Sequence, residues 1–420
     1  MREEVKVFTP LRIGIAVAAM LAAGAAGARA QTTPPAESPA AQQRQTALAL
    51  EQQGQLPEAE EAWRAVLKVR PADAEAYAHL GLLEARQEHY DAAVPLYRKA
   101  LALDPEKPAV RLNLGLAQFK AGRLKPAIET FSLLLKGQPA ASPQAMQLMT
   151  LIGMAHYGLG EYAAAVPYLK KVTASDPQNL PYRLLLAQSC MWSRQFQCVL
   201  DTYHQILVLN PESAEAHMLA GEAYDEMKNA AGATEEFRAA VKANPKLPYA
   251  HFGLGYLLWG QNKLQEAAQE FKAELENVPD EANAMVFLGD CEMQMNQPEQ
   301  ALPLLEKAAQ LAPRSSRAHL DLGTLYSNAG RHDDALRELK LAASLAPNDV
   351  NVHWRLGRLY IAMGKREEAK AEFAKTKQLS EAAENTVFSE LHAAQARGAA
   401  KGDQDGQTPA KQSGEPSASH

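Results

Sequence analysis

Four histidines recur along the chain at multiples of 34 residues, and imidazole nitrogens are common ligands of transition metals. They are His217, His251, His319 and His353. A zinc site needs three or four donors brought together, but no His-x3-His pair and no nearby cysteine supplies that spacing. We therefore expect these rings to pack in the core or at its boundary, and we predict neither a metal site nor a cofactor.

Cysteine thiols are the other reactive side chains, and the chain has three of them. Cys190 and Cys198 lie on either side of an expected turn at residues 193–195, so an exported protein could join them in a disulfide. Two separate buried thiols are the interpretation that we favour. Cys291 has no evident partner, so no disulfide framework supports the fold and helix packing must suffice.

No motif of a known catalytic site occurs in the sequence. We find no G-x-x-x-x-G-K, H-E-x-x-H or G-x-S-x-G, and no segment outside the repeats described below is long enough to hold an active site. The formal net charge is -6 and the sequence pI is about 6.0, whereas phosphate binding needs clustered Lys and Arg. We predict no enzymatic activity and no nucleic-acid partner.

An internal repeat defines the elements that must position all these residues. Prolines recur every 34 residues, with one step of 38 after Pro139, at positions 71, 105, 139, 177, 211, 245, 279, 313 and 347. Ten residues after each proline, or fourteen after Pro139, stands a glycine, except for Ala187. Alanine follows twelve residues later, except at Val199, and a large apolar residue four residues after that.

This pattern predicts pairs of antiparallel helices. Two helices approach closely only where small side chains face each other, so the glycine and alanine mark the crossing and the large residue fills the space beside it. Proline lacks an amide donor and disfavours helix in the residue before it, so it ends each second helix.

The pattern resembles the tetratricopeptide repeat family, whose 34-residue unit reads W-x2-L-G-x2-Y, followed by Ala, Phe and Pro. One close match consists of His319, Leu322, Gly323, Tyr326, Ala335, Leu339 and Pro347, with His where the family often has Trp. The resemblance implies an all-α fold, a right-handed superhelical solenoid of about ten helix-turn-helix units with a C-terminal capping helix.

We expect ten units over residues 40–383, with four inserted residues at 140–143. The predicted units are 40–73, 74–107, 108–145, 146–179, 180–213, 214–247, 248–281, 282–315, 316–349 and 350–383. A separate capping helix is expected at 384–397, since solenoids need covered ends, and a disordered tail at 398–420.

The first thirty residues have the pattern of an export signal. Basic residues precede an apolar, Ala-rich run, and Ala28-Arg29-Ala30 offers the small residues of a cleavage site after Ala30. The alternative is an uncleaved membrane anchor, but the run falls short of the roughly 20 residues that span a bilayer. We predict a periplasmic or secreted protein with no stable membrane span, in which residues 31–39 form a Pro-rich linker.

The resemblance also implies where a ligand would bind, because the family lines a concave groove with positions 2, 5, 9, 12 and 13 of each first helix. Unit seven places four rings on one helical stripe. The predicted groove comprises Tyr249, Phe252, Tyr256, Trp259, Met191, Trp192, Met218 and Met293, with Glu222 and Asp225 favouring a ligand that carries basic groups. The alternative is that some rings fill the solenoid core.

The predicted function is therefore a non-catalytic scaffold that binds a peptide or helix of a partner protein, in assembly of a cell-envelope complex. Two alternatives remain open. The chain could be an accessory subunit of an envelope polysaccharide synthase or transferase, or a structural protein that associates with itself.

Overall fold

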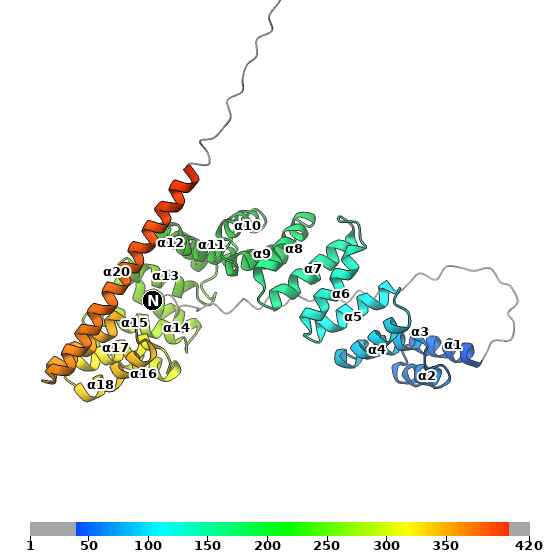
Figure 1. Ribbon diagram of the computed structural model, residues 1–420, viewed down its shortest axis with the longest axis horizontal. Helices are drawn as coiled ribbons and strands as arrows, with labels where there is room; N and C mark the ends of the chain where they lie inside the picture. Colours follow the sequence, from blue (N-terminus) through cyan, green and yellow to red (C-terminus); the bar gives the residue numbers. More distant parts are fainter. Residues whose placement is uncertain (1–38, 403–420) are drawn as a thin grey trace, which may run out of the picture. The chain divides into compact units, whose positions relative to one another are not determined.

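The computed structural model describes residues 39–402, with side chains from residue 41 to 385, and shows an all-α fold in this range (Figure 1). The predicted export signal, nearly all of the linker and residues 403–420 lie outside the described residues. Within residues 39–402, none of the helices combines the length and the apolar character needed to span a bilayer.

The helices form two compact parts, residues 39–247 and residues 248–402, each described here by itself. The first part contains α1 (Pro39–Gln52), α2 (Leu56–Val69), α3 (Ala74–Arg86), α4 (Tyr90–Leu103), α5 (Pro108–Lys120), α6 (Leu124–Lys136), α7 (Pro143–Gly158), α8 (Tyr162–Ser175), α9 (Leu180–Trp192), α10 (Phe196–Leu209), α11 (Ala214–Glu226) and α12 (Ala230–Ala243). The second contains α13 (Ala250–Gly260), α14 (Leu264–Asn277), α15 (Ala282–Gln294), α16 (Pro298–Leu311), α17 (Ser316–Asn328), α18 (His332–Leu345), α19 (Val350–Ala362) and α20 (Arg366–Gly402). Odd-numbered helices are the first helices of the units.

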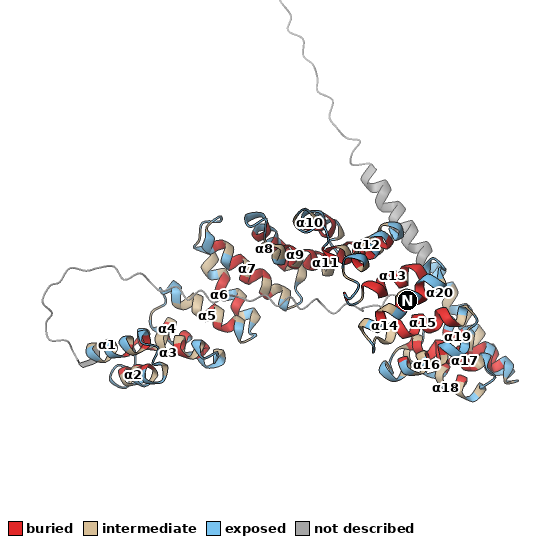
Figure 2. Ribbon diagram, turned by 180° about the vertical axis from the view of Figure 1, so that it is seen from behind, coloured by how far each residue is buried: buried red, intermediate tan, exposed pale blue. Residues whose placement is uncertain are grey.

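Within each part, buried residues line the helix faces that meet neighbouring helices, and exposed residues concentrate at turns and outer faces (Figure 2). The recurring spacing of small and large residues from unit to unit explains the packing inside each hairpin. A Cβ atom placed on Gly115 would lie 2.5 Å from the Phe131 ring, and one on Gly289 would lie 2.8 Å from Leu305. Each unit glycine faces the large residue sixteen positions later, as the repeat predicts.

Of the four recurring histidines, three are buried and His217 is half-buried, so they lie in the core or at its boundary as expected. Each Nδ1 atom lies 2.6 to 2.8 Å from a glutamate on the second helix of its own unit, nineteen residues later. The partners are Glu236, Glu270, Glu338 and Glu372. These imidazoles therefore connect the two helices of a hairpin, a role that repeats from unit to unit.

The end of the repeat array differs from the expectation of a separate capping helix at 384–397. The second helix of unit ten runs on as the single 37-residue helix α20 and reaches Gly402, past the start of the predicted tail. Glu381 stands where the other units carry the proline that ends the helix, and no glycine or proline occurs between residues 366 and 397. Nothing in the sequence interrupts the helix there.

Unit five also differs from expectation, because Cys190 and Cys198 are joined in a disulfide rather than left as separate thiols. Their Cα atoms are 5.8 Å apart, on the last turn of α9 and the first turn of α10. Cys291 is buried and free. The two residues lie on either side of one tight turn, which brings their sulfurs within bonding distance.

Candidate binding surface

The ring stripe predicted on unit seven is partly core. Phe252 is 2% exposed, and its ring centroid lies 5.7 Å from Phe271 and 5.9 Å from Phe287. Tyr249 precedes α13 with φ of 69°, a left-handed conformation, and is half-buried. Phe252 therefore fills the space between α13, α14 and α15, as the core alternative holds, and it is not available to a ligand.

Tyr256 and Trp259 are half-buried and continue the same stripe. Their ring centroids are 6.0 Å apart, and each meets Phe287 of α15 edge-on, at 5.4 Å and 5.1 Å. The Trp259 indole Nε1 donates a hydrogen bond of 2.6 Å to Asp290. Aromatic pairs in such offset geometry add stability beyond their buried area, so the two rings are held in place.

Polar contacts extend this aromatic group from α15 to α17. Asp290 also accepts a hydrogen bond of 2.9 Å from Gln294 and lies 3.3 Å from the Arg317 guanidinium. Arg317 donates to Asp321 at 2.7 Å and lies over the Trp259 ring, 5.4 Å from its centroid. Burial raises the pKa of Asp321 to about 7. One arginine thus connects two carboxylates and an indole across adjacent units.

Helix α19 carries two exposed apolar side chains on one face, and neither was among the groove residues predicted from the sequence. Trp354 is 39% exposed and Ile361 is 55% exposed. With Arg358 they stand at the same unit positions as Phe252, Tyr256 and Trp259, so applying the family positions to unit ten would have found them. Three residues spaced four and three apart share one helical face.

Two guanidinium groups lie against Trp354. The Arg355 and Arg358 groups are 5.1 Å and 5.0 Å from the ring centroid, in the range of cation–π contacts. Among residues whose side chains are described, neither arginine forms an ion pair with a carboxylate. Burial and the neighbouring Arg358 charge lower the pKa of Arg355. This face of α19 therefore carries an exposed indole and two positive charges, of which Arg355 also interacts electrostatically with Asp321 and Asp290.

The remaining predicted groove residues are mostly packed. Met218 is 8% exposed, and Met191 packs against the core of units four to six. Met293 packs against the core of units eight to ten. Trp192 is half-buried and stacks on Tyr162, with centroids 6.0 Å apart. The methionines thus serve chiefly as filling between helices, which their flexible side chains suit.

Glu222 and Asp225 lie on α11 in the first part, and burial changes their chemistry. It raises the pKa of Glu222 to about 8 and also raises the pKa of Asp225. Near neutral pH the Glu222 carboxyl is therefore mainly protonated. It would offer a ligand a hydrogen-bond donor rather than the negative charge that the sequence analysis expected.

Glu222→Gln should remove a pH dependence of stability. The folded pKa lies above the unfolded value of 4.5, so the folded state holds the proton more tightly and stability falls as pH rises from 4.5 towards 8. We expect the thermal midpoint of the variant to match that of the parent near pH 4.5. Near the upper value its thermal midpoint should be higher by at least roughly 2 to 4 °C, because each unit of pKa shift is worth about 1.4 kcal/mol and about 1 kcal/mol already produces that change in a domain of this size.

Thermal unfolding followed by circular dichroism across this pH range measures the effect, with Glu235→Gln as the control on the exposed face of α12. A parent midpoint that falls no more steeply than that of Glu222→Gln would contradict the raised pKa.

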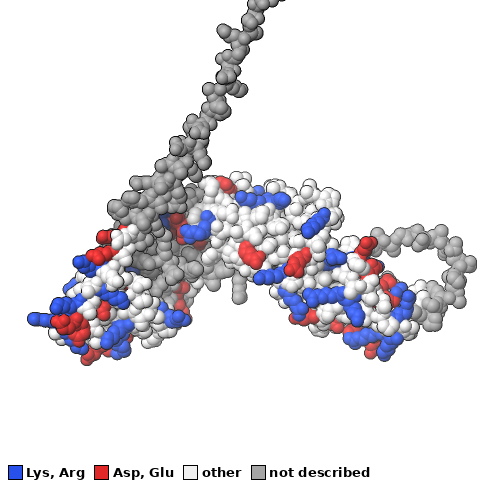
Figure 3. All heavy atoms as spheres, in the orientation of Figure 1, with Lys and Arg blue, Asp and Glu red and all other residues white. Residues whose placement is uncertain are grey.

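The charged surface of the molecule mixes both signs. On the face drawn in Figure 3, Lys and Arg alternate with Asp and Glu over the helices of each part. That face has no continuous basic stripe of the kind that follows a phosphate backbone.

Comparison with known families identifies the repeat. Three models of the tetratricopeptide repeat match the chain, the first at residues 84–152, 293–353 and 329–397. The second matches residues 44–108, 200–248, 229–282 and 252–294, and the third matches 147–179. No curated protein matches the chain in sequence.

Several solved structures of low identity share parts of the fold. YrrB, described as a TPR protein with an unusual peptide-binding site, is 19% identical over 45% of this chain and 97% of its own, with a TM-score of 0.37. Pseudomonas aeruginosa pilF is 20% identical over 49% and 92%, with a TM-score of 0.44. A tetratricopeptide repeat protein from Parabacteroides merdae is 19% identical over 60% and 98%, with a TM-score of 0.45.

The family assignment rests on the models, which together cover residues 44–179 and 200–397. These ranges contain the glycine crossings, the exposed face of α19 and every hairpin except that of unit five, whose first helix and turn fall between them. This chain belongs to the tetratricopeptide repeat family of protein–protein interaction scaffolds.

Proposed function

We propose that this scaffold binds a segment of a partner protein along the first helices of residues 248–402, with Trp354 of α19 as its main anchor. The observation that supports this most directly is the exposed stripe of Trp354, Arg358 and Ile361. A tryptophan offers a large rigid contact area at low entropic cost, and such residues are enriched among the side chains that dominate binding energy.

The chemistry of the stripe selects the ligand. Arg355 and Arg358 have no ion-pair partner among the described side chains, so a ligand with carboxylate groups beside an apolar or aromatic residue would complement them. This differs from the basic ligand expected from Glu222 and Asp225. The half-buried rings of Tyr256 and Trp259 would extend the contact along the first helices, because positions 9 and 12 of the unit recur on α13 and α19.

The cellular setting of the proposal comes from residues 1–30, whose export pattern suggests a periplasmic or secreted protein and hence a partner in an envelope complex. An accessory role beside an envelope polysaccharide synthase or transferase would use the same surface. Self-association would not need it, so the oligomeric state of a surface variant separates that alternative.

Replacing both Trp354 and Arg358 by alanine should weaken capture of envelope partners by roughly 30-fold or more, because removing a central anchor typically costs about 2 kcal/mol. The measurement is the apparent affinity for proteins retained from envelope extracts, and then for the main retained protein after purification. Folding is checked by circular dichroism, since neither side chain belongs to the buried core.

Lys375→Ala with Lys377→Ala on α20 is the matched control, because it also removes exposed side chains from unit ten without touching the stripe. Retention of the same partners with the same affinity by the folded Trp354 and Arg358 variant would overturn the proposal. A variant that loses partners but keeps its sedimentation behaviour would exclude self-association as the main function of this surface.

A further inference from the structure

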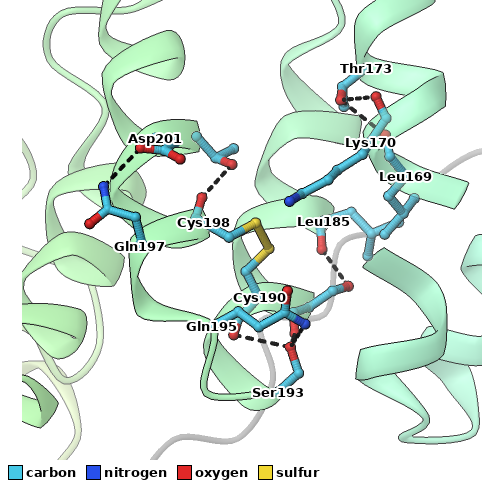
Figure 4. The surroundings of a disulfide bond; sticks show 12 residues. Leu169, Lys170, Thr173, Leu185, Cys190, Ser193, Gln195, Gln197, Cys198 and Asp201 are labelled. Carbon is cyan, nitrogen blue, oxygen red and sulfur yellow. Dashed lines mark hydrogen bonds between the residues drawn. A yellow bond between two sulfur atoms is a disulfide. The ribbon is translucent and has the colours of Figure 1, made fainter. Parts of the chain in front are cut away.

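The disulfide of unit five borders an open cavity of about 460 Å³ in the first part of the chain. Cys198, Arg194 and Phe196 line it, together with Asp201 of α10 and Lys170 of α8. Figure 4 shows Lys170 extending from α8 on the side where the disulfide lies. The cavity is open to solvent, and of the two cysteines it is lined by Cys198 alone.

The two cysteines differ in access. Cys190 is fully buried, whereas Cys198 is 9% exposed and is the one that lines the cavity. A thiolate that opens a disulfide forms a new bond to one sulfur while the other sulfur leaves. Access through the cavity therefore makes Cys198 the attacked residue and Cys190 the leaving group.

The surroundings of Cys198 favour negative charge on sulfur. Cys198 is the third residue of α10, a 14-residue helix, so it lies in the first turn, where unpaired backbone N–H groups stabilise anions. Lys170 adds a second contribution from α8. Both features act on the second exchange, in which Cys198 leaves as a thiolate, whereas access through the cavity makes Cys198 the sulfur that is attacked first.

Lys170 is also the charged group best placed to hold a ligand. Arg194 is paired with Glu226 at 3.0 Å, and Asp201 accepts a hydrogen bond of 2.9 Å from Gln197. Lys170 forms no ion pair among the side chains that the structure describes. An incoming thiol that carries a carboxylate would therefore find an available ammonium beside the sulfur that it attacks.

We propose that Cys190 and Cys198 form an exchangeable disulfide that small anionic thiols of the glutathione class open through this cavity. A first thiolate bonds to Cys198 Sγ, the bond between the two protein sulfurs breaks, and Cys190 leaves as a thiolate that takes up a proton. A second thiolate attacks the sulfur of the bound small molecule and releases Cys198. Two small thiols are thereby oxidised to one disulfide, and two electrons pass to the protein.

Opening the disulfide should weaken the packing of the two helices of unit five more than the packing of the other hairpins. Unit five carries Ala187 and Val199 where units two to four and six to ten have Gly and Ala, so its helices cross with larger side chains between them. The disulfide is a covalent connection between α9 and α10. Because a solenoid can open unit by unit, we expect hydrogen exchange in residues 180–213 to exceed that in 214–247 once the disulfide is reduced.

The first test follows reduction of the folded, oxidised full chain by reduced glutathione or by neutral 2-mercaptoethanol at matched thiolate concentration, with alkylation and mass spectrometry of each cysteine. After reduction by glutathione, both Cys190 and Cys198 should be alkylated. The buried Cys291, whose pKa burial raises to about 12, should stay unmodified. Lys170→Gln should slow the glutathione reaction about two- to five-fold, the range of exposed ion pairs, and leave 2-mercaptoethanol unaffected.

Lys171→Gln is the matched control, because it removes a neighbouring exposed ammonium of α8 that does not line the cavity. Equal slowing by the two lysine variants would overturn the role of the cavity in choosing an anionic thiol. A disulfide that reacts with glutathione only in denaturant would overturn the proposal as a whole and leave a purely structural crosslink.

The second test identifies the accessible sulfur, because in single-cysteine variants of the pair the remaining thiolate must reach and attack oxidised glutathione to form the same mixed disulfide. Cys190→Ser should form a mixed disulfide at Cys198, whereas in Cys198→Ser the buried Cys190 should remain unmodified. Equal modification of both would contradict the assigned direction. Hydrogen exchange of the reduced chain completes the series, and equal protection of 180–213 and 214–247 would contradict the loosening.

Discussion

Gly255→Leu should lower the free energy of unfolding of residues 248–402 by about 2 to 3 kcal/mol, the upper range for overpacking a filled core. Even a Cβ atom at this position would lie 2.9 Å from the Phe271 ring, closer than side chains normally approach. Phe271 is fully buried and touches Phe252 and Phe287, so it cannot move aside without disturbing its neighbours. The measurement is denaturant unfolding followed by circular dichroism.

Gly260→Leu is the matched control on the same helix. Gly260 ends α13, is exposed, and has no atom within 4 Å of the place where a Cβ would lie. We expect a change within about 0.5 kcal/mol, as is usual for surface substitutions. Equal losses in the two variants would mean that the glycine and the ring sixteen residues later do not form the helix crossing.

Glu274→Ala should cost about 2 to 3 kcal/mol, because Glu274 does for α13 what a capping side chain does for most of the other first helices. Ser213, for example, caps α11 through its own hydroxyl. Tyr249, the residue before α13, makes no side-chain cap. Instead, the buried Glu274 carboxylate on α14 accepts hydrogen bonds from the backbone N–H groups of Tyr249, at 2.7 Å, and Phe252, at 3.1 Å.

Removing that carboxylate leaves two helix donors without their acceptor, and a buried donor left unpaired costs about 1 to 3 kcal/mol. Thermal and denaturant unfolding measure the loss, with Glu276→Ala on the exposed side of α14 as control. Glu274→Gln keeps one acceptor oxygen, so its loss of unfolding free energy should lie between those of Glu274→Ala and Glu276→Ala. A loss no larger in Glu274→Ala than in Glu276→Ala would show that α13 does not depend on this contact.

The hairpin architecture could be predicted from the sequence because the same steric requirement recurs in every unit. The pairing of Gly255 with Phe271, and of its equivalents, follows from the 34-residue spacing alone. The course of α20 could also have been predicted, since Glu381 replaces a proline, but the expectation that solenoids end in a separate cap obscured it. The missing proline at Glu381 predicted the end of the array better than the general expectation of a separate capping helix.

The binding surface was harder to predict, because family positions specify which way a residue faces and not whether a neighbour covers it. Phe252 and Trp354 occupy the same unit position, yet one is 2% exposed and the other 39%. The difference arises from Phe287 and Phe271, which surround Phe252. Likewise Glu222 looks like a negative charge in the sequence, and only its burial shows that the carboxyl is mainly neutral near pH 7.

The pairing of each recurring histidine with a glutamate of its own hairpin also bears on how such a chain can change over evolutionary time. His319 with Glu338, and His353 with Glu372, are both contained within one 34-residue unit, as are the glycine and the ring at each crossing. A duplication or deletion of a whole unit by recombination would therefore carry these contacts along intact. Arrays of different length can arise from this gene without a compensating mutation inside any hairpin.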